Sequence, residues 1–221
     1  MHMTERGGEL KKVYSTCSWT IPGHESILRG KLPHSKELRP DEVLENEYNW
    51  GAYPMPMLHD YSFASTALPY LGKKKYTETD IQRYFDDFLN IADCRKDQKL
   101  LDHAEKKIKS SDVGFFGLIN LGGTHYPYNH YDISNKEFRE KWKNGGLQIK
   151  EAHEKQKEAC EDLIEMISDF RKCLPSGTQV IVTADHAELF GEEGGFGHTA
   201  DNDAHFHKKL YEVPLIEWVE K

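Results

Sequence analysis

The chain has 221 residues, of which 38% are hydrophobic and 30% are charged, so one moderately sized domain over 1–221 is expected. Its net charge of −8 argues against a nucleic-acid binder that relies on a basic surface. No apolar run approaches the roughly 18 residues that a membrane-spanning helix needs, so no membrane segment is expected.

The N-terminal residues have no apolar signal-peptide core, so residues 1–12 are expected to form an exposed lead-in. The four cysteines are widely separated and lack the paired spacing of metal ligands, which favours free thiols in a reducing compartment. Together these features predict a cytoplasmic protein.

The first elements in chain order are an extended segment over 13–19 and a helix over 20–30. Pro22 suits the first helical turn and Gly30 the helix end. Residues 34–71 are rich in proline and aromatic residues without long periodicity, which predicts irregular connections with short elements.

Helical spacing of apolar residues predicts helices over 79–91, 98–109 and 151–172. The last of these is the clearest, because five apolar side chains recur on one face. These expected core residues are Cys160, Leu163, Ile164, Ile167 and Phe170.

Two apolar runs, 113–121 and 180–182, predict buried strands, and a further short strand is expected over 211–218. The order of strand, helix and strand is typical of a βαβ unit with parallel strands, which places both following loops at one sheet edge. His125 and the Asp185–His186 pair should therefore face one crevice. The predicted fold class is α/β, with a mainly parallel sheet flanked by helices on both faces.

Asp185 and His186 follow the strand 180–182 and precede a glycine-rich loop that carries His198. A carboxylate and a neutral imidazole are suitable ligands for a divalent metal ion. The alternative is a polar turn in which Asp185 caps the next element.

Four motifs together resemble the sulfatase and alkaline-phosphatase superfamily of metal-dependent hydrolases. In chain order they are Thr20-x-Pro22-x-His24, His125-Tyr-Pro-Tyr128, Asp185-His186-Ala-Glu188 and Gly197-His198. The resemblance implies a reduced form of the alkaline-phosphatase-like three-layer sandwich. It also implies that the family's first strand, which supplies an acidic metal ligand, and its C-terminal subdomain are missing from the sequence.

The resemblance implies that Asp185 and His186 bind a divalent ion, which could be Ca²⁺, Mg²⁺, Mn²⁺ or Zn²⁺. It places Thr20 at the position of the nucleophile and of a further metal ligand, whereas the alternative is a simple helix cap. The backbone N–H groups of Gly23 and His24, near the helix N-terminus, are expected to hold an anionic ester oxygen.

Three histidines have roles that the residues alone leave open. The resemblance places His125 and His198 where they could contact the substrate oxyanion, protonate the leaving oxygen or bind metal. His24 could touch the substrate or pack beneath the helix. His205 and His207, with Asp201 and Asp203, are expected to form a solvated loop rather than a second metal site.

The predicted function is metal-dependent hydrolysis or transfer of a small anionic phosphate or sulfate ester through Thr20. The frame Thr20-Ile-Pro-Gly-His24 lacks the cysteine or serine from which sulfatases make formylglycine, which favours phosphate esters. The alternative is a catalytically degraded fold that binds an anion or a partner protein. The oligomeric state stays open.

Overall fold

The structure is a computed structural model, and it describes residues 8–30, 54–68, 71, 80–126, 128, 149–198 and 207–221. The strands are β1 (Glu9–Tyr14), β2 (Tyr61–Thr66), β3 (Asp87–Asn90), β4 (Phe115–Asn120), β5 (Gln179–Thr183), β6 (Leu189–Phe190), β7 (Phe196–Gly197) and β8 (Glu212–Val219). The α-helices are α1 (Thr20–Arg29), α3 (Pro54–Met57), α4 (Asp97–Lys109) and α6 (Ile149–Phe170). Short 3₁₀ turns occupy Asp80–Tyr84, Arg171–Cys173, Glu192–Gly194 and Lys208–Leu210.

Two three-stranded sheets form the centre of the fold. The first has the order β3-β2-β4 and is parallel throughout, whereas the second has the order β1-β8-β5 and is antiparallel. A small β6-β7 ribbon follows the end of β5. The mainly parallel sheet that the sequence predicts is thus confined to β3-β2-β4.

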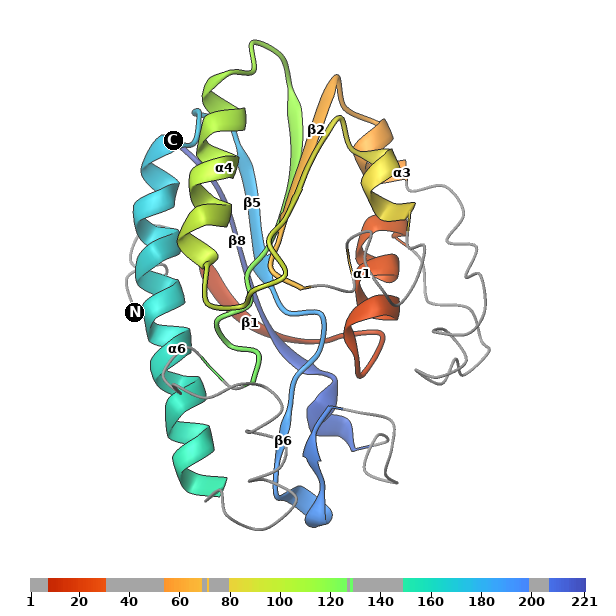
Figure 1. The fold of residues 1–221 in the computed structure, drawn as a ribbon, viewed down its shortest axis with the longest axis vertical. Helices are drawn as coiled ribbons and strands as arrows, with labels where there is room; N and C mark the ends of the chain where they lie inside the picture. Colours follow the sequence, from red (N-terminus) through yellow and green to blue (C-terminus); the bar gives the residue numbers. More distant parts are fainter. Residues whose placement is uncertain are drawn as a thin grey trace.

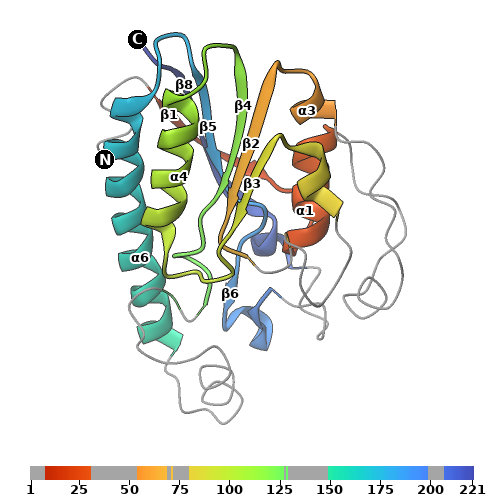
Figure 2. The ribbon, with the colours of Figure 1, turned by 45° about the horizontal axis from the view of Figure 1, so that its top comes forward.

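Helices cover both sides of the strands. Figures 1 and 2 show α4 and α6 on one side and α1 and α3 on the other. Helices α4 and α3 both contact β2 and β4, α4 also packs on α6, and α1 packs on α3. The predicted α/β class with helices on both faces is therefore confirmed. Within the described residues, no helix has the length and apolar character needed to cross a membrane.

Neighbouring residues of β2 explain how the parallel sheet joins the two helical layers. Successive strand side chains point to opposite faces, so Phe63 and Ala64 belong to different core clusters. Phe63 packs with Ala104 and Ile108 of α4, whereas Ala64 packs with apolar residues of α1 such as Leu28. A strand buried on both faces is typical of parallel sheets beneath two helical layers.

Three of the predicted helices correspond to α1, α4 and α6. Helix α1 ends as predicted, with Gly30 in the left-handed conformation at φ 61°. The face of α6 differs from the prediction, because Cys160 is exposed and the buried residues are Ala152, Ala159 and Leu163.

The helix predicted over 79–91 is wrong. A 3₁₀ turn, Asp80–Tyr84, buries Ile81, and the chain then extends as β3 beside β2. Ile81 and Phe85 have helical spacing, but parallel pairing with β2 gives the following backbone its hydrogen bonds.

The parallel βαβ unit predicted around α6 is also wrong. Strand β5 pairs antiparallel with β8 and belongs to a different sheet from β4. The prediction of a buried strand fails as well, since Ile181 is 58% exposed. Residues 9–12 of the expected lead-in are exposed but lie within β1, because β8 provides its partner.

Candidate active site

Thr20 is the first residue of α1, and its side chain is buried beside the end of β5. The helix begins after the extended residue Trp19, and no side chain caps it. Thr20 is 4% exposed, and its Oγ1 lies 3.3 Å from Nε2 of His186. Thr20 is therefore not the helix cap that the alternative interpretation required.

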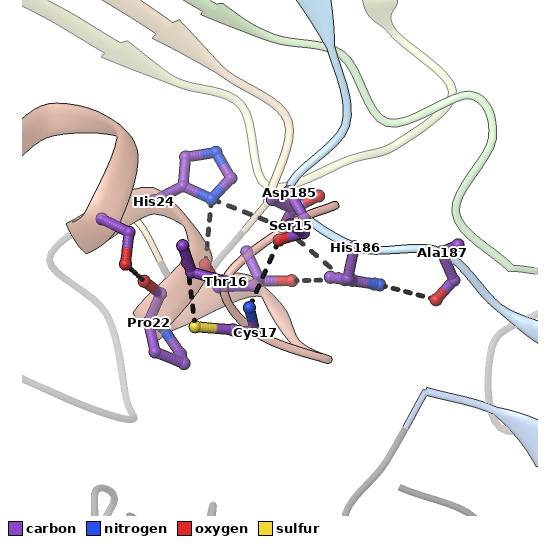
Figure 3. Close-up of polar contacts among 10 residues, drawn as sticks. Ser15, Thr16, Cys17, Pro22, His24, Asp185, His186 and Ala187 are labelled. Carbon is purple, nitrogen blue, oxygen red and sulfur yellow. Dashed lines mark hydrogen bonds and ion pairs between the residues drawn. The ribbon is translucent and has the colours of Figure 1, made fainter. Parts of the chain in front are cut away.

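Asp185 and His186 meet α1 where β5 ends (Figure 3). Oδ2 of Asp185 is buried and has no hydrogen bond among the described residues, although it lies 3.6 Å from Nε2 of His186. The hydroxyl of Ser15 donates to the backbone carbonyl of Asp185 and so fixes the turn. His186 is oriented by a contact of 3.0 Å between its Nδ1 and the carbonyl oxygen of Ala187.

The charge states of this pair suit a cation. Burial opposes ionisation of Asp185, but the neighbouring His186 and His24 outweigh it and hold the carboxyl pKa far below its ordinary value. Burial lowers the pKa of His186, which favours its neutral form. An ionised carboxylate and a neutral imidazole are the forms that bind metal ions.

The donor set fits a divalent metal in chemistry and in spacing. Metal–ligand bonds of about 2.0–2.1 Å in a tetrahedron place neighbouring donor atoms about 3.3 Å apart. The separations of 3.3 Å and 3.6 Å from Nε2 of His186 to Thr20 and Asp185 are close to this value. Within the described ranges no group of three or more His, Cys, Asp or Glu side chains is placed to hold a metal ion.

His24 supports Asp185 from beneath the helix. Its Nδ1 lies 3.0 Å from the carbonyl oxygen of Thr20 and 3.4 Å from Oδ2 of Asp185 (Figure 3). Burial disfavours protonation of His24, but the Asp185 carboxylate outweighs it, so the pKa of His24 is raised. Of the two positions that the sequence left open for this side chain, the structure has the packed one.

Gly23 allows the end of β5 to approach α1. A Cβ atom at this position would lie 3.0 Å from both Cβ and the carbonyl oxygen of Asp185. The Gly23 N–H donates to the carbonyl of Trp19 at 3.3 Å. The hydrogen bond of the first helical turn thus uses this amide, and its expected contact with a substrate oxygen stays a prediction.

His125 and His198 lie close to His186. The ring centroid of His198 is 4.0 Å from that of His186 and 5.5 Å from that of His125. Nδ1 of His198 contacts Oε1 of Glu188 at 3.0 Å, and the hydroxyl of Tyr128 donates to the other oxygen of this carboxylate at 2.7 Å. His125 and the Asp185–His186 pair thus lie near one another, as predicted, although the strands are arranged differently; a shared crevice stays a prediction.

The remaining predicted cluster of His205, His207, Asp201 and Asp203 lies mostly outside the residues that the structure describes. His205, Asp201 and Asp203 lie outside the described residues. His207 precedes a 3₁₀ turn, and its Nδ1 accepts from the backbone N–H of Lys209 at 3.1 Å.

Two supporting residues had no role in the sequence interpretation. Ser15 was within the extended segment before α1, and its contact with Asp185 links residues 170 positions apart. Glu188 is part of the Asp185-His186-Ala-Glu188 motif. Its position two residues after the candidate ligand His186 is the signal that could have suggested that Glu188 bonds a histidine such as His198.

Comparisons with known proteins identify this fold. The chain is similar to the C-terminal periplasmic domain of EcEptC from Escherichia coli, with 16% identity and a TM-score of 0.67 over 100% of this chain and 64% of that one. The Zn complex of that domain gives 15% identity and a TM-score of 0.66, over 100% of this chain and 65% of that one. The C-terminal periplasmic domain of phosphoethanolamine transferase EptC from Campylobacter jejuni gives 13% identity and 0.61, over 99% and 70%.

A further similar structure is lipoteichoic acid synthase LtaP from Listeria monocytogenes, with 13% identity and a TM-score of 0.57 over 95% of this chain and 56% of that one. The chain therefore shares the fold of these transferase and synthase domains. It spans about two thirds or less of the E. coli and Listeria structures. No family profile matches the sequence. No curated protein matches it either.

The expectation of a cytoplasmic protein is contradicted by these similarities, because the matched domains of both EptC proteins are periplasmic. The four cysteines are free, as expected. Free thiols occur in proteins on either side of a membrane, so they were insufficient grounds for assigning the compartment.

Proposed function

We propose that this protein is a metal-dependent transferase or hydrolase of phosphate esters, with Thr20 as its nucleophile. The observation that carries the proposal is the 3.3 Å separation between the buried Thr20 hydroxyl and Nε2 of His186, beside the unbonded carboxylate oxygen of Asp185. A hydroxyl at a helix N-terminus next to two metal-ligand side chains has the surroundings that an activated nucleophile needs.

Thr20, Asp185 and His186 would hold the metal ion. When bound, a divalent cation there stabilises the Thr20 alkoxide, so that the hydroxyl proton is lost to water. The Zn complex of the similar E. coli domain makes Zn²⁺ the first ion to test. His24 keeps the Asp185 carboxylate in place through their 3.4 Å contact.

The proposed reaction proceeds in two displacements. Oγ1 of Thr20 attacks phosphorus, and a new P–O bond forms as the bond to the leaving alcohol oxygen breaks. The leaving oxygen takes a proton from His125 or His198, which lie beside His186. Water or a second alcohol then attacks phosphorus and gives its proton to the same histidine. A new P–O bond forms as the bond between phosphorus and Oγ1 of Thr20 breaks, so the phosphoryl group leaves on the acceptor and Thr20 regains its proton from water.

Two observations favour phosphate over sulfate esters. Threonine stands in the frame where formylglycine sulfatases have cysteine or serine. One similar structure is named a phosphoethanolamine transferase, and phosphoethanolamine is itself a phosphate ester. The periplasmic matches also support an extracytoplasmic location for this protein.

The proposal is tested by assaying the purified chain with chromogenic phosphomonoesters, phosphodiesters and sulfate esters, with Zn²⁺, Mn²⁺, Mg²⁺ or Ca²⁺ added. We expect metal-dependent turnover of a phosphate ester that Thr20→Ala lowers by about 100-fold or more. The exposed Thr16→Ala is the matched control and should change turnover by less than about twofold. Acid-quenched samples should contain phosphate bound to Thr20 in peptide mass spectrometry.

Absence of turnover with every metal, or turnover unchanged by Thr20→Ala, would sink the proposal. The competing function is a non-catalytic module that binds an anion or a protein, and it is favoured by the small number of classical ligands in the described residues. It predicts anion binding without metal. A stoichiometric metal ion in elemental analysis of the wild type that is lost in Asp185→Asn would exclude it.

A further inference from the structure

Asp97, the first residue of α4, binds the loop that carries His125. Its side chain is 2% exposed. Oδ1 accepts from the backbone N–H of Gly122 at 2.8 Å, and Oδ2 accepts from the N–H of Gly123 at 2.8 Å. One buried carboxylate therefore uses both oxygens on consecutive amides of a loop 25 residues away.

The bound amides directly precede the turn that ends at His125. The carbonyl of Gly122 accepts from the N–H of His125 at 2.9 Å, so Gly122 is held through both of its backbone polar groups. Little freedom remains for this backbone, since a Cβ at Gly122 would lie 2.7 Å from Cα of Cys94 and 2.8 Å from Cβ of Ala67.

We propose that Asp97 is a positioning residue that fixes the His125 loop, and with it the His125 ring, against His198 in the active site. The inference rests on the proposed function of that site. The bonds of Asp97 to Gly122 and Gly123 lie on the loop backbone, so its effect on His125 is through that backbone. Asp97 acts through two charge-assisted hydrogen bonds, which are stronger than bonds to a neutral acceptor.

A carboxylate suits this position better than the isosteric amide. Both loop groups are donors, and asparagine offers one acceptor oxygen and one donor –NH₂ group. Asp97→Asn would therefore place a donor against the N–H of Gly122 or Gly123. The negative charge is also favoured at the N-terminus of α4, where the helix dipole is positive.

The test compares Asp97→Asn with Asp102→Asn, an exposed carboxylate on the same helix that bonds Gln98. In Asp97→Asn, we expect hydrogen exchange of the Gly122 and Gly123 amides to become about tenfold faster or more. The side-chain NMR signals of His125 should shift, whereas those of His103, which also lies on α4, should stay unchanged. Asp102→Asn should leave all of these signals as in the wild type.

The same variants separate positioning from binding in the assay with Zn²⁺. We expect Asp97→Asn to lower kcat by about 10-fold to 100-fold, because a small displacement of a reacting group has effects of this size. The KM and the Zn²⁺ affinity should change by less than about twofold, since the metal donors are untouched. Unchanged amide exchange and His125 signals in folded Asp97→Asn would overturn the inference, whether or not the wild type is active.

If Asp97→Asn does not fold, the same NMR measurement is made on Asp97→Glu. It keeps the charge and moves the carboxylate by one methylene. Shifted His125 signals with unshifted His103 signals would support the inference, and wild-type His125 signals would overturn it. A failure of the proposed function gives a different result. In that case the wild type shows no turnover, but Asp97→Asn still changes the amide exchange and the His125 signals.

Discussion

The close approach of α1 to the end of β5 makes Gly23→Ala the most direct test of the site's geometry. The added Cβ would lie 3.0 Å from Cβ and from the carbonyl oxygen of Asp185. Ordinary carbon contacts are about 3.5–4.0 Å, so the end of β5 or the helix must move by a few tenths of an ångström. Overpacking of this kind costs about 1–3 kcal/mol.

Alanine is also the better helix former, and this gain of about 1 kcal/mol offsets part of the overpacking. We therefore expect Gly23→Ala to lower the free energy of unfolding by about 1 kcal/mol, or the Tm by about 2–4 °C in a chain of this size. The displacement of Asp185 should weaken Zn²⁺ binding, because the carboxylate no longer lies at its distance from His186.

Thermal unfolding and isothermal titration with Zn²⁺ measure the two effects of Gly23→Ala. Gly114→Ala is the control, since a Cβ there has no heavy atom within 4 Å and should leave both quantities near the wild-type values. A Gly23→Ala protein that is at least as stable as the wild type, with unchanged Zn²⁺ affinity, would refute the close approach of Gly23 and Asp185.

Two further substitutions test the hydrogen bonds around the loop after β5. Tyr128→Phe removes the donor to the buried Glu188 carboxylate and should cost about 1–3 kcal/mol in denaturant unfolding; an unchanged midpoint would contradict this bond. Burial would raise the pKa of Glu192, but Lys209 and the Phe190 N–H outweigh it and lower this pKa to about 2. The ionised Glu192 therefore stabilises the fold fully above pH 4.5, and this contribution is lost as the pH falls towards about 2. Glu192→Gln should flatten the pH dependence of Tm in this range and, after allowance for solvent screening, cost about 1 kcal/mol at pH 7. Parallel pH profiles of the wild type and the variant would contradict this.

The sequence predicted α1 and the proximity of His125 to the Asp185–His186 pair correctly because their signals are local. Pro22 in the first turn and Gly30 at the end determine the limits of α1, and loops that follow apolar runs carry the histidines. The sheet topology was not predictable in this way. Strand β5 has the β-branched residues of a buried parallel strand, but its partner β8 lies about 30 residues later and fixes its direction and its exposure.

The supporting groups of the site were beyond sequence reasoning for a related reason. Asp97 is an ordinary first-turn residue of a helix until the loop at Gly122 and Gly123 is placed next to it. Helical spacing likewise could not show that Phe88 belongs to a strand, because parallel pairing with β2 decides it. Such contacts depend on tertiary structure, whereas motif residues are visible one by one.

The run from Asp185 to Glu188 shows how one short motif can serve both halves of the site. Asp185 and His186 face Thr20 and His24 of α1, and Glu188 faces His198 on the following loop. Movement of this segment would therefore disturb the contacts of Thr20 and of His198 together. This coupling explains why the segment is held by Ser15 at its start and by the backbone bond from the N–H of Ala187 to the carbonyl of Leu210 further along. The bonds that hold the segment therefore help to keep both the Thr20 hydroxyl and the His198 ring in contact with His186.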